Sequence, residues 1–256
     1  MNTVFTPNEM MTIAAARALS NDDVVFVGIG APSAACNVAR LTHAPDITLI
    51  YESGTLGTKP NILPLSIGDG ELCETAVTTV SVPEMFRYWL QGGRIKVGFL
   101  GGAQIDKYAN LNTTVVGPYD APKVRLPGGG GAPEIATSCG EIFIIMAQGK
   151  RSFVDKLDFV TSIGHVSGGD SRAKLGVKTK GPTRLITDMA VFEPDPETKE
   201  MIVVSIHPNV TRDMIQENTG WTVRYAAKVA ETPPPTAKEL EVLRDLNART
   251  AKAQAA

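Results

Sequence analysis

The stretch "VVFVGIGAPSAACNVARLTHAPDITLIYESG", residues 24–54, decides the fold class of this chain. It opens with an apolar run, 24–27, that is typical of a buried strand and ends in the glycine turn Gly28–Gly30. Pro32 then marks the first turn of a helix, because a proline there loses no intrahelical hydrogen bond. A second apolar strand follows and stops at Glu52. Strand, turn, helix and strand make a βαβ unit, in which two parallel strands are joined by a right-handed crossover.

The segments on either side of this unit continue the alternation of strands and helices. Thr6 and Glu9 make a capping-box pair around Pro7, so a helix is expected from residue 7 onward. Further helices are expected at 83–93, where Met85, Trp89 and Leu90 fall on or near one face, at 210–220 after the cap Thr211, and at 237–250. Further strands are expected within 94–106, at 141–147 and, as two antiparallel strands joined by a Pro/Asp turn, within 183–210.

These patterns together predict an α/β fold with an open, mostly parallel sheet flanked by helices and an antiparallel hairpin late in the chain. The sequence shows no internal repeat, so residues 1–256 are expected to form a single domain. The proline-rich segment 232–236, "TPPPT", is expected to be a stiff spacer before the C-terminal helix.

Composition limits the classes of partner. Hydrophobic residues make up 43% of the chain and charged residues 20%, and the net charge of −2 carries no electrostatic signature of a nucleic-acid or membrane-surface binder. The sequence has no apolar run near the ~18–20 residues that span a bilayer and no basic, then apolar, leader. Its three cysteines are odd in number and far apart, which suits reduced thiols. A cytoplasmic protein without nucleic-acid or membrane partners is expected.

The histidines do not suggest a metal centre. His43, His165 and His207 show no ligand spacing among themselves, and no cysteine–histidine cluster accompanies them. Each is expected to be a surface or core histidine, and no metal site is predicted.

Glu52 is the best-placed reactive group in the sequence. It lies where an apolar strand stops, in a turn with Ser53 and Gly54. Such an acid could be a nucleophile, a base, a ligand of a ribose hydroxyl or a solvated turn residue. The ribose interpretation depends on a dinucleotide fingerprint in which Gly28 and Gly30 match and a serine stands in place of the third glycine. The plainer alternative is that both glycines only shape a tight turn between strand and helix.

Four consecutive glycines, Gly128, Gly129, Gly130 and Gly131, form the second candidate feature. A run of four glycines loses much backbone entropy on folding, more than a simple turn requires. The functional interpretation is that their N–H groups bind an anion or a developing oxyanion; the alternative is a flexible surface loop. Gln104 follows an apolar strand and could orient a ligand, although the polar residues after it are also ordinary turn formers.

Six segments carry a resemblance that runs from about residue 8 to about residue 245. They are "GIGAP" (28–32), "APDITLIYESG" (44–54), "FLGGAQIDKYANLNTTVVG" (99–117), "GGGGAPEIAT" (128–137), "FVDKLDFVTSIGH" (153–165) and "HPNVTRDMIQENTGW" (207–221). In these segments the chain resembles the β subunit of a family I CoA-transferase, most closely that of glutaconate CoA-transferase.

The resemblance implies that Glu52 is a covalent nucleophile. Its carboxylate would attack an acyl-CoA, pass through a mixed anhydride and hold CoA as a glutamyl thioester, with ping-pong kinetics. Gly128–Gly131 would then form an oxyanion and CoA-binding segment, with N–H donors from Gly129 onward. Gly28, Gly30, Ser53, Gly54 and Gln104 would border the substrate pocket.

The resemblance also implies partners and substrates. An α subunit of similar fold would complete the active site in an α2β2 or larger assembly. Coenzyme A would be a substrate rather than a permanently bound cofactor, and the acyl groups would be short, possibly dicarboxylic, with a carboxylic acid as acceptor. Two other functions stay open, an acyl-CoA hydrolase of the same fold and a non-enzymatic ligand-binding module.

Overall fold

A computed structural model describes residues 4–255, which form two compact units. Unit 1 joins the chain up to residue 99 with the segment from 234 onward, and unit 2 holds residues 100–233. The helices of unit 1 are α1 (Pro7–Arg17), α2 (Ala31–Thr42), α3 (Gly70–Glu74), α4 (Val82–Glu84), the π-helix η1 (Met85–Leu90) and α8 (Ala237–Gln254). Its strands are β1 (Val24–Val27), β2 (Thr48–Tyr51), β3 (Thr55–Leu56), β4 (Thr78–Thr79) and β5 (Val97–Leu100).

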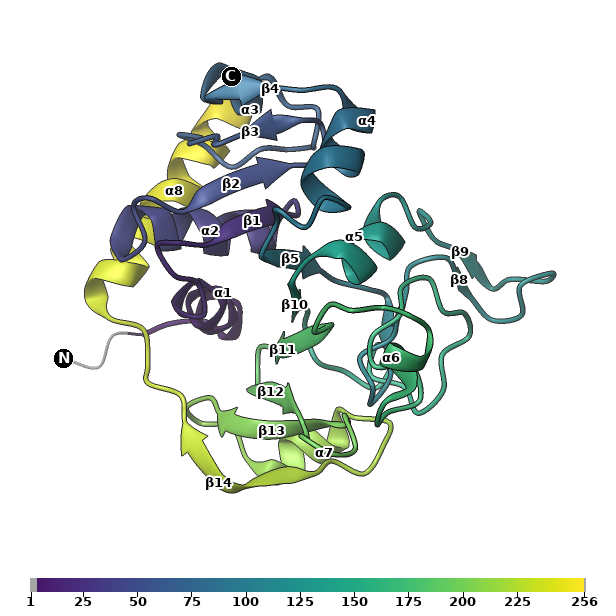
Figure 1. Ribbon diagram of the computed structural model, residues 1–256. Helices are drawn as coiled ribbons and strands as arrows, with labels where there is room; N and C mark the ends of the chain where they lie inside the picture. The colour runs from purple at the N-terminus through teal and green to yellow at the C-terminus, as the bar shows by residue number, and fades with distance from the viewer. Residues whose placement is uncertain (1–3, 256) are drawn as a thin grey trace. The chain divides into compact units, whose positions relative to one another are not determined.

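The strands of unit 1 follow the order β5-β1-β2-β3-β4 (Figure 1). β1 pairs in parallel with both β5 and β2, which confirms the predicted βαβ unit. β3 and β4 then extend the sheet as antiparallel strands. Because Val27 is the register partner of Tyr51, β1 and β2 end at the same level.

Helices cover both faces of this sheet. Successive side chains of a strand point to opposite faces, so Phe26 faces away from Val27 and its partner Tyr51. Tyr51 reaches Ser33 of α2, whereas Phe26 makes an edge-to-face contact with Phe86 of η1. The buried side chains of β1 and β2 are therefore held between α2 on one face and η1 on the other.

The two terminal helices of unit 1 are tied together. The predicted capping box of Thr6 and Glu9 begins α1. Arg17 at the end of α1 donates two hydrogen bonds of 2.7 Å to the carboxylate of Glu239 in α8. Glu9 accepts from Arg244 one turn further along α8. Two ion pairs between the same helices, one near each end of α1, fix their alignment.

The segment 83–93 differs from its prediction. An amphipathic helix was expected, but only α4 is α-helical, and the helix continues as η1. Gln91 N–H donates to Phe86 O and Arg94 N–H to Trp89 O, which are bonds between residues five apart. This wider turn brings Met85 and Leu90, both fully buried, toward the same side.

Unit 2 has three helices and nine strands among its described residues. The helices are α5 (Ala132–Ser138), α6 (Ser171–Lys174) and α7 (Arg212–Glu217). The strands are β6 (Gln104–Ile105), β7 (Leu111–Asn112), β8 (Val115–Val116), β9 (Val124–Arg125), β10 (Glu141–Ile145), β11 (Pro182–Ile186), β12 (Ala190–Pro194), β13 (Met201–Ile206) and β14 (Tyr225–Glu231). Five of them follow the order β14-β13-β12-β11-β10, while β6–β7 and β8–β9 form separate hairpins.

The segment 183–210 holds an additional turn. The predicted hairpin is present as antiparallel β12 and β13. The first strand of that predicted hairpin is in fact two strands. β11 and β12 pair with each other in antiparallel fashion. Thr187 makes the turn between them: its hydroxyl accepts hydrogen bonds from the N–H groups of Met189 (3.1 Å) and Ala190 (2.9 Å).

The predicted α/β class, with a mostly parallel sheet, flanking helices and a late antiparallel hairpin, is confirmed. Residues 232–236 have no regular structure, and Thr236 caps α8 with Glu239 in a second capping box. That residues 1–256 act as one domain stays a prediction. Among residues 4–255, no helix combines the length and apolarity that crossing a bilayer requires.

Candidate active site

Glu52 lies in a three-residue turn between β2 and β3. Tyr51 and Thr55 close the turn as register partners, and Gly54 N–H donates to Tyr51 O (3.0 Å). The Glu52 side chain is half-buried, and no donor among the described residues binds its carboxylate. The strand register therefore presents a carboxylate whose oxygens are not used by the fold.

Gly54 determines the shape of this turn. Its φ is +103°, a backbone conformation that L residues rarely adopt. A Cβ at this position would lie 2.0 Å from Val80 O, and Val80 N–H donates to Gly54 O (2.9 Å). Only glycine allows the backbone just past β4 to approach so closely, which fixes the turn that holds Glu52.

The Gly28–Gly30 turn leaves the neighbouring strand at the level of Glu52. Gly28 follows Val27 directly, and Glu52 follows its register partner Tyr51. Gly30 has φ +80° and is the N-cap residue of α2. The helix therefore begins without a hydrogen bond from a capping side chain. The structure thus brings Gly28, Glu52, Ser53 and Gly54 together at the carboxyl ends of two parallel strands, where open α/β sheets bind ligands.

Ser33 explains the missing third glycine of the dinucleotide fingerprint. That glycine normally allows a helix to pack closely on its strand. Here Ser33 Oγ lies 2.7 Å from the hydroxyl of Tyr51, and both residues are fully buried. Burial raises the pKa of the Tyr51 hydroxyl, so the pair is a neutral hydrogen bond. α2 is spaced from β2 by this polar contact, which gives the ribose interpretation of Glu52 no support.

Two hydroxyl groups of the same turn region have no partner. Ser53 Oγ and Thr55 Oγ1 are buried, and neither forms a hydrogen bond among the described residues. Thr55 is only 1% exposed. An unpaired buried hydroxyl costs about 1–3 kcal/mol. The segment beside Glu52 therefore contains two polar groups whose hydrogen-bonding capacity is not used.

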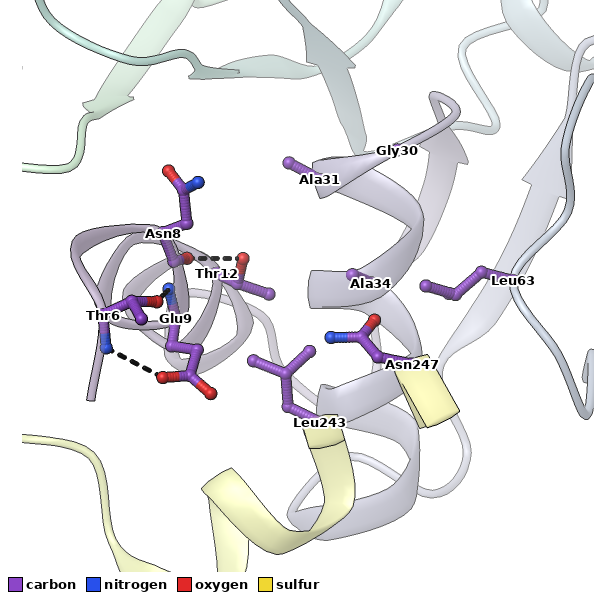
Figure 2. A pocket seen from close by; sticks show the side chains of 10 residues that line it. All are labelled: Thr6, Asn8, Glu9, Thr12, Gly30, Ala31, Ala34, Leu63, Leu243 and Asn247. Carbon is purple, nitrogen blue, oxygen red and sulfur yellow. Dashed lines mark hydrogen bonds between the residues drawn. The ribbon is translucent and has the colours of Figure 1, made fainter. Parts of the chain in front are cut away.

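A cavity of about 490 Å³ opens at the start of α2, within unit 1. Figure 2 shows its walls, with α1 on one side and α2 and α8 on the other. It is lined by Thr6, Asn8, Glu9, Thr12, Gly30, Ala31, Ala34, Leu63, Leu243 and Asn247. Gly30 lines this cavity, but Glu52 is not among the residues around it, so the predicted place of Gly30 in a substrate pocket stays a prediction.

The four glycines lie in unit 2, immediately before α5. Gly128 N–H donates to Thr113 O (2.9 Å), whereas the N–H groups of Gly129–Gly131 have no acceptor among the described residues. Gly130 has φ +49° and Gly131 has φ −84° and ψ −3°. Left-handed and right-handed residues in succession point their N–H groups into one concavity, an arrangement that binds anions.

Gln104 is also in unit 2, and its side chain is occupied. Its Nε2 donates to Asp158 Oδ2 (2.8 Å), and its Oε1 accepts from Asn112 Nδ2 (2.7 Å). Gln104 is 6% exposed. These contacts join β6, β7 and the loop of Asp158; its predicted place in the substrate pocket stays a prediction.

The histidines bind backbone carbonyl groups. Nε2 of His43 lies 3.1 Å from Leu19 O, and the corresponding contacts of His165 and His207 are with Pro182 O (2.7 Å) and Thr187 O (2.9 Å). Burial lowers the pKa of His165 and of His207. Within residues 4–255, no group of His, Cys, Asp and Glu side chains could hold a metal ion.

Sequence patterns did not identify Ser33, Tyr51 or Thr113 as parts of these two regions. Tyr51 is the last residue of its strand and carries a hydroxyl group immediately before Glu52, and that position was a usable signal. Thr113 contacts Gly128 from 15 positions away, so no local pattern could have indicated it.

Comparisons with known proteins agree on one family. A family model described as Coenzyme A transferase matches residues 8–218. The chain is 61% identical to the B subunit of 3-oxoadipate CoA-transferase from Pseudomonas knackmussii, over 97% of this chain and 96% of the relative. It is 36% identical to the B subunit of glutaconate CoA-transferase from Acidaminococcus fermentans, over 93% and 91%. The crystal structure of glutaconate coenzyme A-transferase from that organism superposes with a TM-score of 0.90 at 32% identity, over 97% of each chain.

Proposed function

Since the chain belongs to the coenzyme A transferase family, we propose that it moves CoA between a short acyl-CoA and a carboxylic acid with Glu52 as covalent nucleophile. The resemblance stated from six sequence segments and the assignment as a CoA-transferase are confirmed by these comparisons. The role of Glu52 and the identity of the substrates are the parts that remain to be tested.

The observation that carries the proposal is the state of the Glu52 carboxylate. It lies at the end of β2, in a turn whose shape Gly54 fixes, and it accepts no hydrogen bond from the described residues. A solvated turn acid would not need a turn whose close contact with Val80 only glycine permits. A nucleophile does need a fixed backbone and free oxygens, because misplacement by ~1 Å can cost ~100-fold in rate.

The reaction divides into exchanges at carboxyl groups. A Glu52 oxygen attacks the thioester carbonyl, the C–S bond breaks, and a mixed anhydride and CoA thiolate form. The thiolate then attacks the glutamyl carbonyl, releases the donor acid as a carboxylate and leaves Glu52 as a CoA thioester. An acceptor carboxylate repeats both steps in reverse and restores Glu52. No reactant is oxidised or reduced. CoA is transferred from one acid to the other and is therefore a substrate.

The tetraglycine segment provides the second element. Each step passes through a tetrahedral intermediate whose oxygen carries negative charge, and N–H donors that are already oriented stabilise such an oxygen. The N–H groups of Gly129–Gly131 have no acceptor among the described residues. Gly130 is left-handed and Gly131 right-handed, and this alternation supports the same role. Ser53, with a buried and unpaired hydroxyl beside Glu52, is a further donor for a bound acyl group.

A partner chain is part of the proposal. Each of the two relatives is named as the B subunit of a CoA-transferase, which supports an α subunit for this chain as well. We expect that α chain to have a similar fold and to complete the active site in an α2β2 or larger assembly. Three free cysteines suit a cytoplasmic location.

The relatives also indicate a substrate class. One is named for 3-oxoadipate and the other for glutaconate, and both compounds are dicarboxylic acids. The proposal for this chain is therefore a short dicarboxylic acyl group, with 3-oxoadipate as the first acid to test because that relative is 61% identical.

The test uses the chain assembled with its α subunit. Acyl-CoA is added without acceptor, and the enzyme is treated with borohydride. The mass of the peptide that contains Glu52 is then measured by mass spectrometry. A glutamyl thioester is reduced to the alcohol, whereas a free carboxylate is not. Transfer that proceeds while this peptide keeps its unmodified mass contradicts the nucleophile. Release of CoA without any acceptor would indicate a hydrolase, and acyl-CoA binding without turnover would indicate a binding module.

A further inference from the structure

The tetraglycine segment is held at its first residue by one side chain, that of Thr113. Thr113 Oγ1 donates to Gly128 O (2.8 Å), and Gly128 N–H donates back to Thr113 O (2.9 Å). Thr113 is itself held, because its N–H donates to Thr161 Oγ1 (2.9 Å). Two hydrogen bonds thus fix both polar groups of Gly128.

The bond to Gly128 O has a consequence for the next residue. A peptide group is planar, so the carbonyl of Gly128 and the N–H of Gly129 point in opposite directions from the same plane. Gly128 has φ +101°, and the two residues that flank this peptide, Gly128 and Gly129, lack a Cβ that would oppose its rotation. The hydroxyl of Thr113 therefore sets the direction of the Gly129 N–H, which has no acceptor among the described residues.

The far end of the segment is fixed independently. Gly131 is the N-cap residue of α5. The guanidinium group of Arg172 donates to Ala136 O near the end of that helix (2.7 Å) and to Gly164 O (2.9 Å). Gly129 is also confined, since a Cβ there would lie 3.3 Å from both Pro133 and Thr161. Ala132 N–H donates to Gly129 O (2.9 Å), which holds the following peptide, so the peptide between Gly128 and Gly129 depends on Thr113 for its orientation.

We propose that Thr113 is a positioning residue that aims the Gly129 N–H at the substrate oxygen, an inference that rests on the proposed function of the tetraglycine segment. Thr113 does not touch the reacting atoms. It acts by preventing rotation of one peptide group, so that the donor is oriented before charge develops on the tetrahedral intermediate.

The test compares three variants of the assembled enzyme. Thr113→Val keeps the shape and removes the hydroxyl, and Thr113→Ser keeps the hydroxyl and removes the methyl group. Thr183→Val is the matched control, because the hydroxyl of Thr183 donates to Glu141 (2.7 Å) and not to the tetraglycine segment or to Thr161. We expect Thr113→Val to lower kcat about 10- to 100-fold with KM for acyl-CoA within twofold, since loss of one oxyanion donor costs ~100- to 1,000-fold and misorientation costs part of that. Thr113→Ser and Thr183→Val should keep kcat within about threefold of the unaltered enzyme.

A purely structural role of Thr113 predicts a lower melting temperature for Thr113→Val but no fall in kcat at an unchanged KM. This outcome overturns the inference. A kcat of Thr113→Val equal to that of Thr183→Val, in an enzyme whose Glu52 is labelled by borohydride, also overturns it. Should Thr113→Val fail to assemble, Thr113→Ala also removes the hydroxyl, and a kcat equal to that of Thr113→Ser is equally decisive. If the unaltered enzyme is never labelled at Glu52, the proposed function fails and this inference fails with it.

Discussion

The hydroxyl oxygen of Tyr51 lies 2.7 Å from Ser33 Oγ in the buried layer between β2 and α2. This contact joins the residue before Glu52 to the first turn of the helix that follows the Gly28–Gly30 turn. The two backbone segments at the candidate active site are therefore linked through the core beneath them.

Tyr51→Phe should lower the free energy of unfolding by about 1–3 kcal/mol, because Ser33 then keeps a buried hydroxyl without its partner. Ser33→Ala should act similarly. The double variant removes both polar groups and should cost clearly less than the sum of the two single changes. Urea titration of the three variants measures this, and strictly additive effects would show that the two hydroxyls do not interact.

Glu52→Gln should abolish most of the transfer activity, by at least ~100-fold in kcat, because an amide cannot form the mixed anhydride. Glu52→Asp withdraws the carboxylate by one methylene and should cost ~100-fold. Glu74→Gln, an identical chemical change at an exposed position in the same unit, is the control and should retain full activity. Steady-state assays with acyl-CoA and acceptor acid decide this, and near-normal rates in Glu52→Gln would exclude covalent catalysis by this residue.

Gly54→Ala should destabilise unit 1 by at least ~2 kcal/mol and inactivate the enzyme, because the new Cβ would overlap Val80 O at 2.0 Å and the backbone has φ +103°. Gly70→Ala is the matched control, since nothing lies within 4 Å of its Cβ position and its φ is not positive. It should change the free energy of unfolding by no more than ~1 kcal/mol. Equal melting temperatures for the two variants would mean that the close approach at Gly54 is not needed.

Glu239 gives unit 1 a stability that depends on pH. Burial alone would raise the pKa of Glu239, but hydrogen bonds from Arg17 and Thr236 outweigh it and lower that pKa from 4.5 to about 2. A lowered pKa in the folded state means that the stabilisation is complete above about pH 4.5 and disappears as the pH falls toward 2. Glu239→Gln should therefore be less stable than the unaltered protein at pH 7, and the difference should narrow between pH 4.5 and 2.

Thermal unfolding at several pH values measures that difference, with Glu241→Gln on the exposed side of the same helix as control. A gap between Glu239→Gln and the unaltered chain that stays constant down to pH 2 would show that the carboxylate charge does not contribute.

Local signals in the sequence were sufficient for much of unit 1. The capping box of Thr6 and Glu9, the strand before Gly28 and the helix that begins beside Pro32 each depend on residues within four positions of one another. Glu52 was identified in the same way, from an acid at the end of an apolar strand. Such features follow from the backbone preferences of a few neighbouring residues, so one segment contains all the information.

The errors have physical causes of two kinds. At 100° per residue, Met85 and Leu90 would lie about 140° apart on an α-helix, so two buried residues five apart were a sign of the wider π-turn. In the late hairpin, the hydroxyl of Thr187 made a turn inside what was expected to be a single strand. In both cases a few hydrogen bonds outweighed the general apolar pattern.

Contacts between distant positions could not be predicted. Arg17 and Glu239 are 222 positions apart, and Thr113 and Gly128 are 15 apart. Which threonine or arginine makes such a contact depends on the completed fold rather than on its neighbours in the chain. For the candidate residues this means that Glu52 could be proposed from the sequence, whereas the contacts of Thr113 and Arg17 could not.

The division of the chain into units also determines an order of events during synthesis. Unit 1 needs α8, whose Leu240, Leu243 and Leu246 are buried in its core, and this helix is made after unit 2. Unit 2 is continuous in sequence and is complete before α8 is made. At ~5–20 residues per second, α1 and the segment with Glu52 must wait roughly ten seconds or more for the helix that covers them. All of unit 2 is therefore synthesised while unit 1 still lacks the helix that completes its core.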